Sequence, residues 1–432
     1  MIRKTYQARR RTILTGAAAA ATVGAAAACG DGDGPAGTAD DPITIGFDWW
    51  GNETRADLTT QALALFEEKN PGIKVRPNFS DYAPHWESLT TRMASQDLPD
   101  VFQMDYPRLL QFGGTGMLTP LEGLVDTSDF RGNLLDTGMV DGELLAVPVA
   151  GNTNGLIYRD DWWSEHGLSA PEPGYTWDDY SDAIATLSPA LGEEKWAAED
   201  WTNSYIFLEM WLLQQGSFFY SEDGSQLGFT KEQLVEWWSM NSSLKADGHL
   251  PPADVGSEWD AGGMEADAIG SMIRWDNALA NVWPFVEDNG GTVAIGAPPT
   301  LDPGNLGIYL KPSMQLVIAA NSNHPEESGK LIEFLLMDPE AVKILGTNRG
   351  IPATNTGLAS VELDPASQAI VAYEESVAAH LGAPPPPPPA AAGGVQVKYT
   401  ELVEQVQYEE MTPEEAAERF FTEAETLFAA EQ

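Results

Sequence analysis

The stretch Gly142–Trp163, GELLAVPVAGNTNGLIYRDDWW, places two short apolar runs on either side of a polar, glycine-rich segment. The runs Leu144–Val149 and Leu156–Tyr158 are each long enough for one buried strand. Two strands joined by flexible polar backbone suggest that the chain crosses here between two bodies. Asn152 and Asn154 would lie in that crossing, free to hydrogen-bond a ligand held there. The alternative is an ordinary loop within one domain, and these residues alone favour neither.

Length and charge limit what the protein can be. The chain has 432 residues, more than one hydrophobic core usually holds, which predicts two domains. Its formal net charge is −42, so its surface repels nucleic acid and anionic lipid headgroups. The acidity also argues weakly against a phosphorylated or carboxylated ligand. Alternatively, it serves only solubility.

The first 41 residues are predicted to lie outside the fold. Residues 1–28 combine a basic head with an uncharged, alanine-rich run, and Arg10-Arg11 resembles a twin-arginine export signal. Small residues before Cys29 resemble a bacterial lipobox, which predicts a lipid anchor on Cys29; a plain signal peptide and a free thiol are the alternative. The apolar run is shorter than the ~20 residues of a membrane span. Cys29 is the only cysteine, and residues 29–41 are expected to form a flexible tether.

A strand–helix–strand unit follows the tether. Ile43–Phe47 alternates in polarity as a strand does, a capping box begins a helix at Thr54, and Ile73–Val75 is the next strand. The unit implies a parallel sheet, and ligands of such sheets bind beyond the carboxyl ends of the strands. The candidate ligand-binding residues at those ends are Trp49, Trp50, Asn52, Asp81 and Tyr82.

A third strand near Val101 ends at Asp105 and Tyr106. A carboxylate beside an aromatic ring suits a sugar, because the ring stacks on C–H groups while the carboxylate accepts hydroxyl hydrogens. The alternative for Asp105 is a cap on the next helix.

Several segments together resemble the extracellular solute-binding proteins of sugar ABC importers, the family 1 or maltose-binding-protein-like proteins. They include ITIGFDWWGNETR, LPDVFQMDYPRLLQFGGTGMLTPL, GELLAVPVAGNTNGLIYRDDWW and GGMEADAIGSMIRWDNALANV, and similarity of order and spacing extends over nearly all of residues 42–432. The resemblance implies an α/β, two-lobe periplasmic-binding-protein type II fold. Each lobe would be a mostly parallel sheet flanked by helices, with hinge crossings between them. The first lobe would hold residues 42–150 and 300–337, and the second 151–299 and 338–432.

The same resemblance implies a function. The protein would bind a neutral mono- or oligosaccharide outside the cytoplasmic membrane and deliver it to ABC permease subunits. It would be a monomer that touches the membrane only through its lipid anchor, and it would bind no nucleic acid. By position in the family pattern, Trp201, Trp275 and Asp276 join the candidate ligand-binding residues, with Trp275 the foremost stacking residue. The proline run in APPPPPPAAAGG, residues 383–394, departs from the family pattern and is expected to be an exposed polyproline loop.

Alternative chemistries have weaker support in the sequence. The chain has no phosphate-binding glycine loop, zinc-type helix motif or serine nucleophile elbow, and its five histidines are scattered, so we expect no cofactor, metal or catalytic residue. A glycoside hydrolase, which needs only two suitably spaced carboxylates, is one alternative. A phosphodiester or polyamine ligand is a further alternative; for a phosphate, only Arg55 and Arg349 are near the predicted cleft. Fourteen tryptophans favour a sugar.

Overall fold

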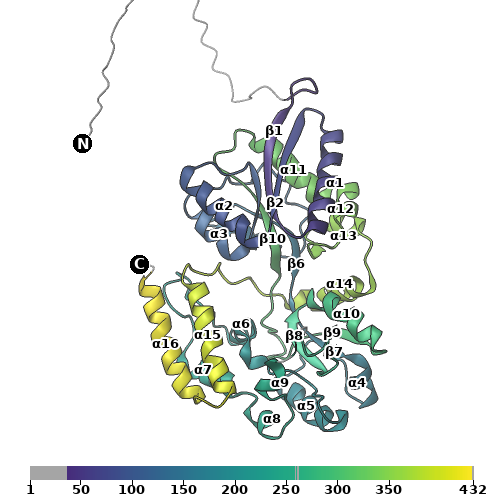
Figure 1. The fold of residues 1–432 in the computed structure, drawn as a ribbon, viewed down its shortest axis with the longest axis vertical. Coiled ribbons are helices and arrows are strands. Elements are labelled where there is room, and N and C mark those ends of the chain that lie inside the picture. Colours follow the sequence, from purple (N-terminus) through teal and green to yellow (C-terminus); the bar gives the residue numbers. More distant parts are fainter. Residues whose placement is uncertain (1–36, 258, 260–261, 431–432) are drawn as a thin grey trace, which may run out of the picture.

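The computed structural model describes residues 37–257, 259 and 262–430, which fold into two lobes, one above the other in Figure 1. The predicted export signal, Cys29 and most of the tether lie outside the described residues. Within the described part of the chain, no helix has the length and apolarity needed to cross a membrane.

The upper lobe is built on a six-stranded mixed sheet with the order β11-β6-β10-β3-β1-β2. Strands β1 and β2 pair in parallel from Ile43↔Ile73 to Trp50↔Ser80, so the predicted strand–helix–strand unit is confirmed. β3 is also parallel to β1, whereas β10 is antiparallel to both β3 and β6. The strands are β1 (Ile43–Trp50), β2 (Ile73–Ser80), β3 (Val101–Met104), β6 (Val147–Asn152), β10 (Lys311–Ile318) and β11 (Ile351–Pro352).

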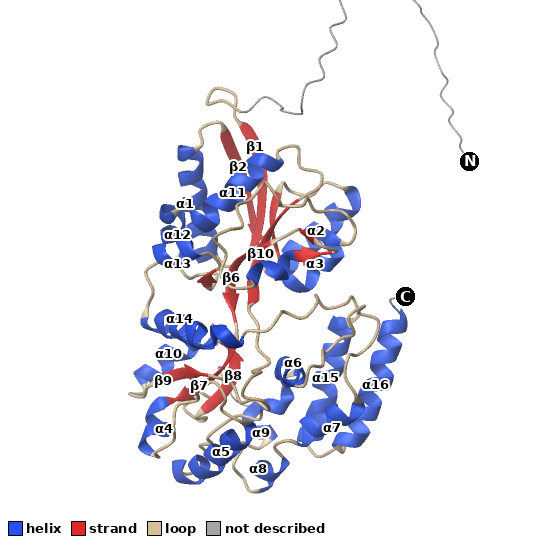
Figure 2. Ribbon diagram, turned by 180° about the vertical axis from the view of Figure 1, so that it is seen from behind, coloured by secondary structure: helices blue, strands red, loops and turns tan. Residues whose placement is uncertain are grey.

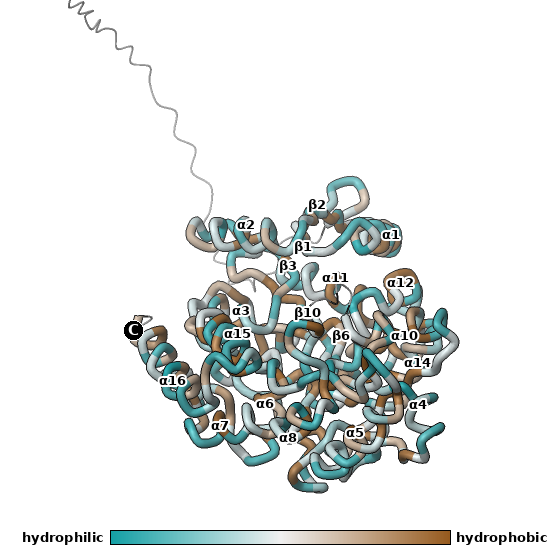
Figure 3. The backbone as a smooth tube through the Cα atoms, turned by 60° about the horizontal axis from the view of Figure 1, so that its bottom comes forward, coloured by the Kyte–Doolittle hydropathy of each residue, from teal (hydrophilic) through white to brown (hydrophobic). Residues whose placement is uncertain are grey.

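Helices cover both faces of this sheet (Figure 2). One face packs against α1, α11 and α12 through residues such as Phe66 and Leu331, and the other against α2 and α3 through Trp86 and Leu109. In Figure 3 the tube around β10 is largely brown, as expected for a strand with neighbours on both sides, whereas the outer helix α4 of the lower lobe is teal. The helices of the upper lobe are α1 (Glu53–Lys69), α2 (Tyr82–Ser95), α3 (Tyr106–Gly113), α11 (Pro325–Met337), α12 (Pro339–Leu345) and α13 (Asn355–Ser360); a 3-10 turn (Leu134–Gly138) and the hairpin β4 (Met139–Val140) and β5 (Glu143–Leu144) complete it.

The lower lobe is mostly helical around a three-stranded sheet with the order β8-β7-β9. Both neighbours of β7 are antiparallel to it, so the expectation of a mostly parallel sheet in each lobe is wrong for this one. The upper sheet is mixed, with three antiparallel pairs and two parallel ones. Its strands are β7 (Asn154–Arg159), β8 (Ser271–Trp275) and β9 (Val293–Gly296). Its helices are α4 (Asp160–Glu165), α5 (Trp177–Leu191), α6 (Tyr205–Gln214), α7 (Lys231–Ser239), α8 (Ser242–Ala246), α9 (Ala253–Ser257), α10 (Ala278–Asp288), α14 (Pro365–Val377), α15 (Ala392–Gln407) and α16 (Pro413–Ala430), with 3-10 turns at Trp201–Asn203 and Ala378–His380.

The chain passes between the lobes at three places. β6 runs through Thr153 directly into β7, as the sequence predicts, Tyr309 leads into β10, and residues 361–364 join α13 to α14. Two predicted boundaries differ from this arrangement. Leu306 and Ile308 pack in the core of the lower lobe, and α12 and α13 pack beside α11 in the upper lobe, so residues 300–308 and 338–360 were assigned to the wrong lobes.

Trp201 belongs to the core of the lower lobe. It is 1% exposed, and its ring lies 5.8 Å from that of Trp177 and 5.2 Å from that of Tyr180. The prediction that it stacks on a ligand is therefore wrong, because no face of its ring is open.

We expect Trp201→Ala to lower the free energy of unfolding by about 3–5 kcal/mol, the usual cost of emptying a buried aromatic site. Urea denaturation measures the change. The half-buried Trp283 of α10 provides the comparison, since Trp283→Ala should cost clearly less. Equal denaturation midpoints for Trp201→Ala and the wild type would contradict the core assignment.

Candidate functional site

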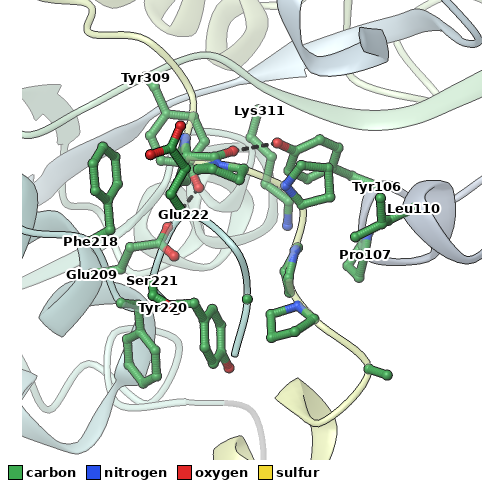
Figure 4. A pocket seen from close by; sticks show the side chains of 18 of the residues that line it. Tyr106, Pro107, Leu110, Glu209, Phe218, Tyr220, Ser221, Glu222, Tyr309 and Lys311 are labelled. Atoms are coloured by element: carbon green, nitrogen blue, oxygen red, sulfur yellow. Dashed lines mark hydrogen bonds between the residues drawn. The ribbon is translucent and has the colours of Figure 1, made fainter. Parts of the chain in front are cut away.

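Two cavities flank the strands that join the lobes, and both are lined by Trp275 and Lys311. The first, which we call the aromatic cavity, has a volume of about 400 Å³ (Figure 4). Its walls come from the start of α3, from α6 and the loop 218–224, from the crossing at Tyr309, and from the proline run 385–389. Both lobes therefore contribute to it.

Aromatic rings give this cavity its character. Tyr106 enters from the upper lobe, and Tyr205 and Tyr220 enter from the lower lobe. The ring of Trp275 meets that of Tyr309 edge to face, with centroids 5.9 Å apart. Such rings offer flat apolar faces and hydroxyl groups together, which is what a sugar ring with its C–H faces and hydroxyls requires.

Glu209 is an acidic group of this cavity that contacts one of these rings. Its carboxylate accepts a hydrogen bond of 2.7 Å from the hydroxyl of Tyr309. Burial raises the pKa of Glu209, while that hydrogen bond and the positive charge of Lys311 act in the opposite direction. Burial also raises the pKa of Tyr309 well above its ordinary value, so this phenol is a hydrogen-bond donor at neutral pH.

The proline run forms a wall of the aromatic cavity instead of the exposed loop that its composition predicts. Pro385 is buried, and its carbonyl oxygen accepts a hydrogen bond of 2.6 Å from the Tyr106 hydroxyl. Just before it, the carbonyl of Gly382 accepts a bond of 2.7 Å from the Asn133 side chain. Both donors belong to the upper lobe, whereas the run leads into α15 of the lower lobe, so it connects the two lobes beside the cavity (Figure 2).

The second cavity, which we call the polar cavity, has a volume of about 440 Å³. It is lined by the first turns of α1, α10 and α14, by Asn152 and residues 311–314 of the crossing strands, and by residues 347–351. Among the described residues, no group of three or more histidine, cysteine or acidic side chains is arranged to hold a metal ion.

Three of the residues predicted from sequence line these cavities. Tyr106 and Trp275 line the aromatic cavity, and Asn152 and Trp275 line the polar one. A second group, at the carboxyl ends of β1, β2 and β3, lines neither cavity. There Trp50 packs edge to face on Tyr82, and the Tyr82 hydroxyl donates a hydrogen bond of 2.7 Å to Asp105.

The remaining predicted residues either cap helices or are buried. Asn52 caps α1 by accepting a hydrogen bond from the backbone N–H of Arg55, and Asp81 occupies the N-cap position of α2. Trp49 is 1% exposed between Phe47 and Phe79, so its predicted contact with a ligand is wrong. Asn154 and Asp276 are also buried, and Asp276 accepts a hydrogen bond of 2.9 Å from the backbone N–H of Thr153. Their predicted role as direct ligand contacts is therefore not supported by their positions.

Sequence reasoning missed several residues of the aromatic cavity, namely Tyr205, Glu209, Tyr220, Tyr309 and Lys311. Only Glu209 had a signal in the sequence that could have identified it. Glu209 is the single charged residue in α6, YIFLEMWLLQ, whose other residues are almost all apolar. A lone carboxylate in a buried helix demands a polar partner, and this partner is Tyr309.

Comparison with known proteins supports a common architecture. The family model described as bacterial extracellular solute-binding protein matches residues 61–374. An uncharacterized ABC transporter extracellular-binding protein of Pyrococcus horikoshii is 24% identical over 71% of this chain and 71% of its own. A diacetylchitobiose-binding protein of Streptomyces coelicolor is 22% identical over 80% of this chain and 82% of its own. The solved structure of a family 1 extracellular solute-binding protein from Alicyclobacillus acidocaldarius is similar with a TM-score of 0.78 and 27% identity, over 90% of this chain and 99% of that one.

Asp276, which directly follows Trp275, and Glu374 of α14 form a buried carboxyl pair. Burial first, and the neighbouring charge of Glu374 second, raise the pKa of Asp276 well above its ordinary value. Burial also raises the pKa of Glu374, against the opposing effect of Arg131. The pair therefore holds a proton at pH values where both groups would be ionised in the unfolded chain.

We expect this pair to make the protein less stable as the pH rises. The folded state binds more protons than the unfolded state above about pH 4, so the free energy of unfolding falls by up to about 1.4 kcal/mol per pH unit until the folded pair has ionised. In Asp276→Asn the slope should be smaller, which denaturation between pH 4 and 8 measures. Glu122→Gln, at an exposed carboxylate, is the control. Parallel curves for Asp276→Asn and the wild type would contradict the assignment.

Proposed function

Because the chain belongs to the bacterial extracellular solute-binding proteins, we propose that it is the substrate-binding component of an ABC importer for a sugar or oligosaccharide. In this role it captures the sugar outside the cytoplasmic membrane and delivers it, chemically unchanged, to the permease subunits.

The aromatic cavity is the observation that carries the proposal. Tyr106 from one lobe and Tyr205, Tyr220 and Trp275 from the other converge on it. Each ring stacked on a sugar contributes roughly 0.5–1.5 kcal/mol beyond simple burial. Two or three stacks with paired hydroxyls approach the roughly −8 kcal/mol of micromolar binding. The diacetylchitobiose-binding relative supports a saccharide as the class of ligand.

The crossings between the lobes supply the mechanism of capture. Closure of two lobes about such segments removes water from the ligand and creates a surface that differs from the open form. A permease that recognises only the closed form would then respond only to loaded protein. In this scheme the protein needs no catalytic step, and the saccharide would be recovered intact after incubation.

We also propose that residues 1–28 are removed on export and that lipid-modified Cys29 holds the protein at the outer face of the membrane. Mass spectrometry of protein extracted from bacterial membranes should find the N-terminal Cys29 carrying fatty acid. A mature chain that begins elsewhere or carries an unmodified thiol would contradict this.

We expect Trp275→Ala to weaken binding of the best saccharide from a thermal-shift panel by at least about tenfold, or about 1.4 kcal/mol. Calorimetry measures the affinity, and the melting temperature of the free protein should change little because Trp275 is only half-buried. Trp283→Ala is the matched control, since Trp283 lines neither cavity. Equal affinities for Trp275→Ala and the wild type would remove Trp275 from the site, and loss of the saccharide by cleavage would contradict the transport role.

A further inference from the structure

The polar cavity has a positive lining in a strongly acidic protein. Arg55, Lys311 and Arg349 line it with a single carboxylate, that of Asp364. Asp364 is engaged in its own helix, where it accepts a hydrogen bond of 2.7 Å from the backbone N–H of Ser367. The local charge is therefore opposite in sign to the net charge of −42.

None of the three cations of this cavity forms an ion pair with a described residue, although the charge of Lys311 also acts on Glu209 of the aromatic cavity. Of the eighteen lysine and arginine side chains of the described chain, twelve form ion pairs, and the other three that form none are Arg76, Arg108 and Lys330. Among the described residues, no carboxylate oxygen lies within ion-pair distance of Arg55, Lys311 or Arg349. In a chain with 65 acidic residues and 23 basic ones, carboxylates are abundant, so three unpaired cations around one cavity need a physical reason.

Hydrogen bonds hold both guanidinium groups in fixed positions. Arg55 donates from Nε to the side-chain oxygen of Asn348 at 2.9 Å and from Nη2 to its carbonyl at 3.0 Å. Arg349 donates from Nη2 to the Thr59 hydroxyl at 2.7 Å, while its buried Nη1 has no acceptor among the described residues. Burial, with a contribution from Arg55, lowers the pKa of Arg349 to about 9. An anion beside Arg349 would offset this uncompensated charge.

Neutral polar atoms of the same cavity also lack partners. The side-chain oxygens of Asn152 and Ser313 are buried without a hydrogen-bond partner among the described residues. The Asn152 oxygen can only accept, so it calls for a donor such as a sugar hydroxyl, whereas Arg349 Nη1 calls for an acceptor. Trp275 contributes a ring to the wall, and Lys311 Nζ lies 5.1 Å from the centre of that ring.

We propose that the polar cavity binds the anionic group of an acidic sugar, with Arg349 and Lys311 as its cationic partners and Asn152 accepting from a neighbouring hydroxyl. Guanidinium groups pair with the two oxygens of a carboxylate or phosphate, and fixed ones lose little freedom in doing so. The proposal rests on the proposed function, since it names the class of sugar taken up. It replaces the neutral saccharide expected from sequence, because the local field in a cavity outweighs the screened net charge of a distant surface.

The test compares sugars that differ only in charge. Glucuronic and galacturonic acids supply a carboxylate, glucose 6-phosphate supplies a phosphate, and glucose and galactose are the neutral parents. In calorimetric titrations of the purified protein, at least one of the two anionic classes should bind at least tenfold more tightly than its neutral parent. The class that does so identifies the anionic group.

Arg349→Met should lower the affinity for that acidic sugar at least tenfold and leave the affinity for its neutral parent within about twofold. Arg76→Met is the matched control, because Arg76 is exposed on β2 and lines neither cavity. If Arg349→Met does not fold, Lys311→Met should lower the affinity for the acidic sugar at least tenfold more than it lowers the affinity for the neutral parent. Lys311→Met removes the other proposed cationic partner, which lies on β10.

Two outcomes separate the two proposals. If neutral sugars bind as tightly as acidic ones, or if both cavity variants keep the wild-type preference for the acid, the anion site is refuted while the sugar-transport proposal stands. If no saccharide of either class binds and a charged metabolite without a sugar ring does, both proposals are refuted.

Discussion

A reciprocal pair of hydrogen bonds at the crossing fixes the geometry on which both cavities depend. The carboxylate of Asp276 accepts from the N–H of Thr153 at 2.9 Å, and the N–H of Asp276 donates to the carbonyl of Thr153 at the same distance. The Tyr373 hydroxyl donates to the carbonyl of Asn154, one residue further along. Because Trp275 directly precedes Asp276, its ring is held at the boundary of the lobes by backbone that is bonded from both sides. Asp276 is buried and does not contact a ligand itself. Its role is to position the neighbouring Trp275.

Trp275 and Lys311 line both cavities. The aromatic cavity is otherwise lined by tyrosines and Glu209, and the polar cavity by arginines and amides. Net charge averages over the surface and is screened within about 10 Å at ordinary ionic strength. The sign of the electrostatic potential in a cavity is instead set by the few charged groups that line it and by their burial. The acidity of the whole chain is therefore a weak guide to the charge of its ligand.

The sequence contained enough to predict the architecture and part of the site. Period-two alternation specifies β1 locally. The predicted helix after β1 is present, but the capping box predicted at Thr54 is wrong, because Asn52 caps α1. Residues at strand ends include Tyr106 and Trp275. Trp49 and Trp201 fit the same pattern but are buried, because the rings that cover them come from β2 and α5, distant in sequence. The predicted strand direction in the lower sheet is wrong for a similar reason. The pairing of β7 with β8 and β9 joins segments more than a hundred residues apart.

The proline run shows how a segment without hydrogen-bond donors can become part of a binding wall. Proline has no N–H, so such a segment is normally solvated, which is why composition predicts exposure. Here the carbonyl groups that would need water find donors instead, from Tyr106 to Pro385 and from Asn133 to Gly382. Consecutive prolines lose little conformational entropy on ordering, so a wall of this kind costs less to fix than a flexible loop. Because its donors lie in the upper lobe and its C-terminal end continues into the lower one, the run must follow any movement between the lobes. Its stiffness therefore restricts both the shape of the aromatic cavity and the path by which the lobes can close around a sugar.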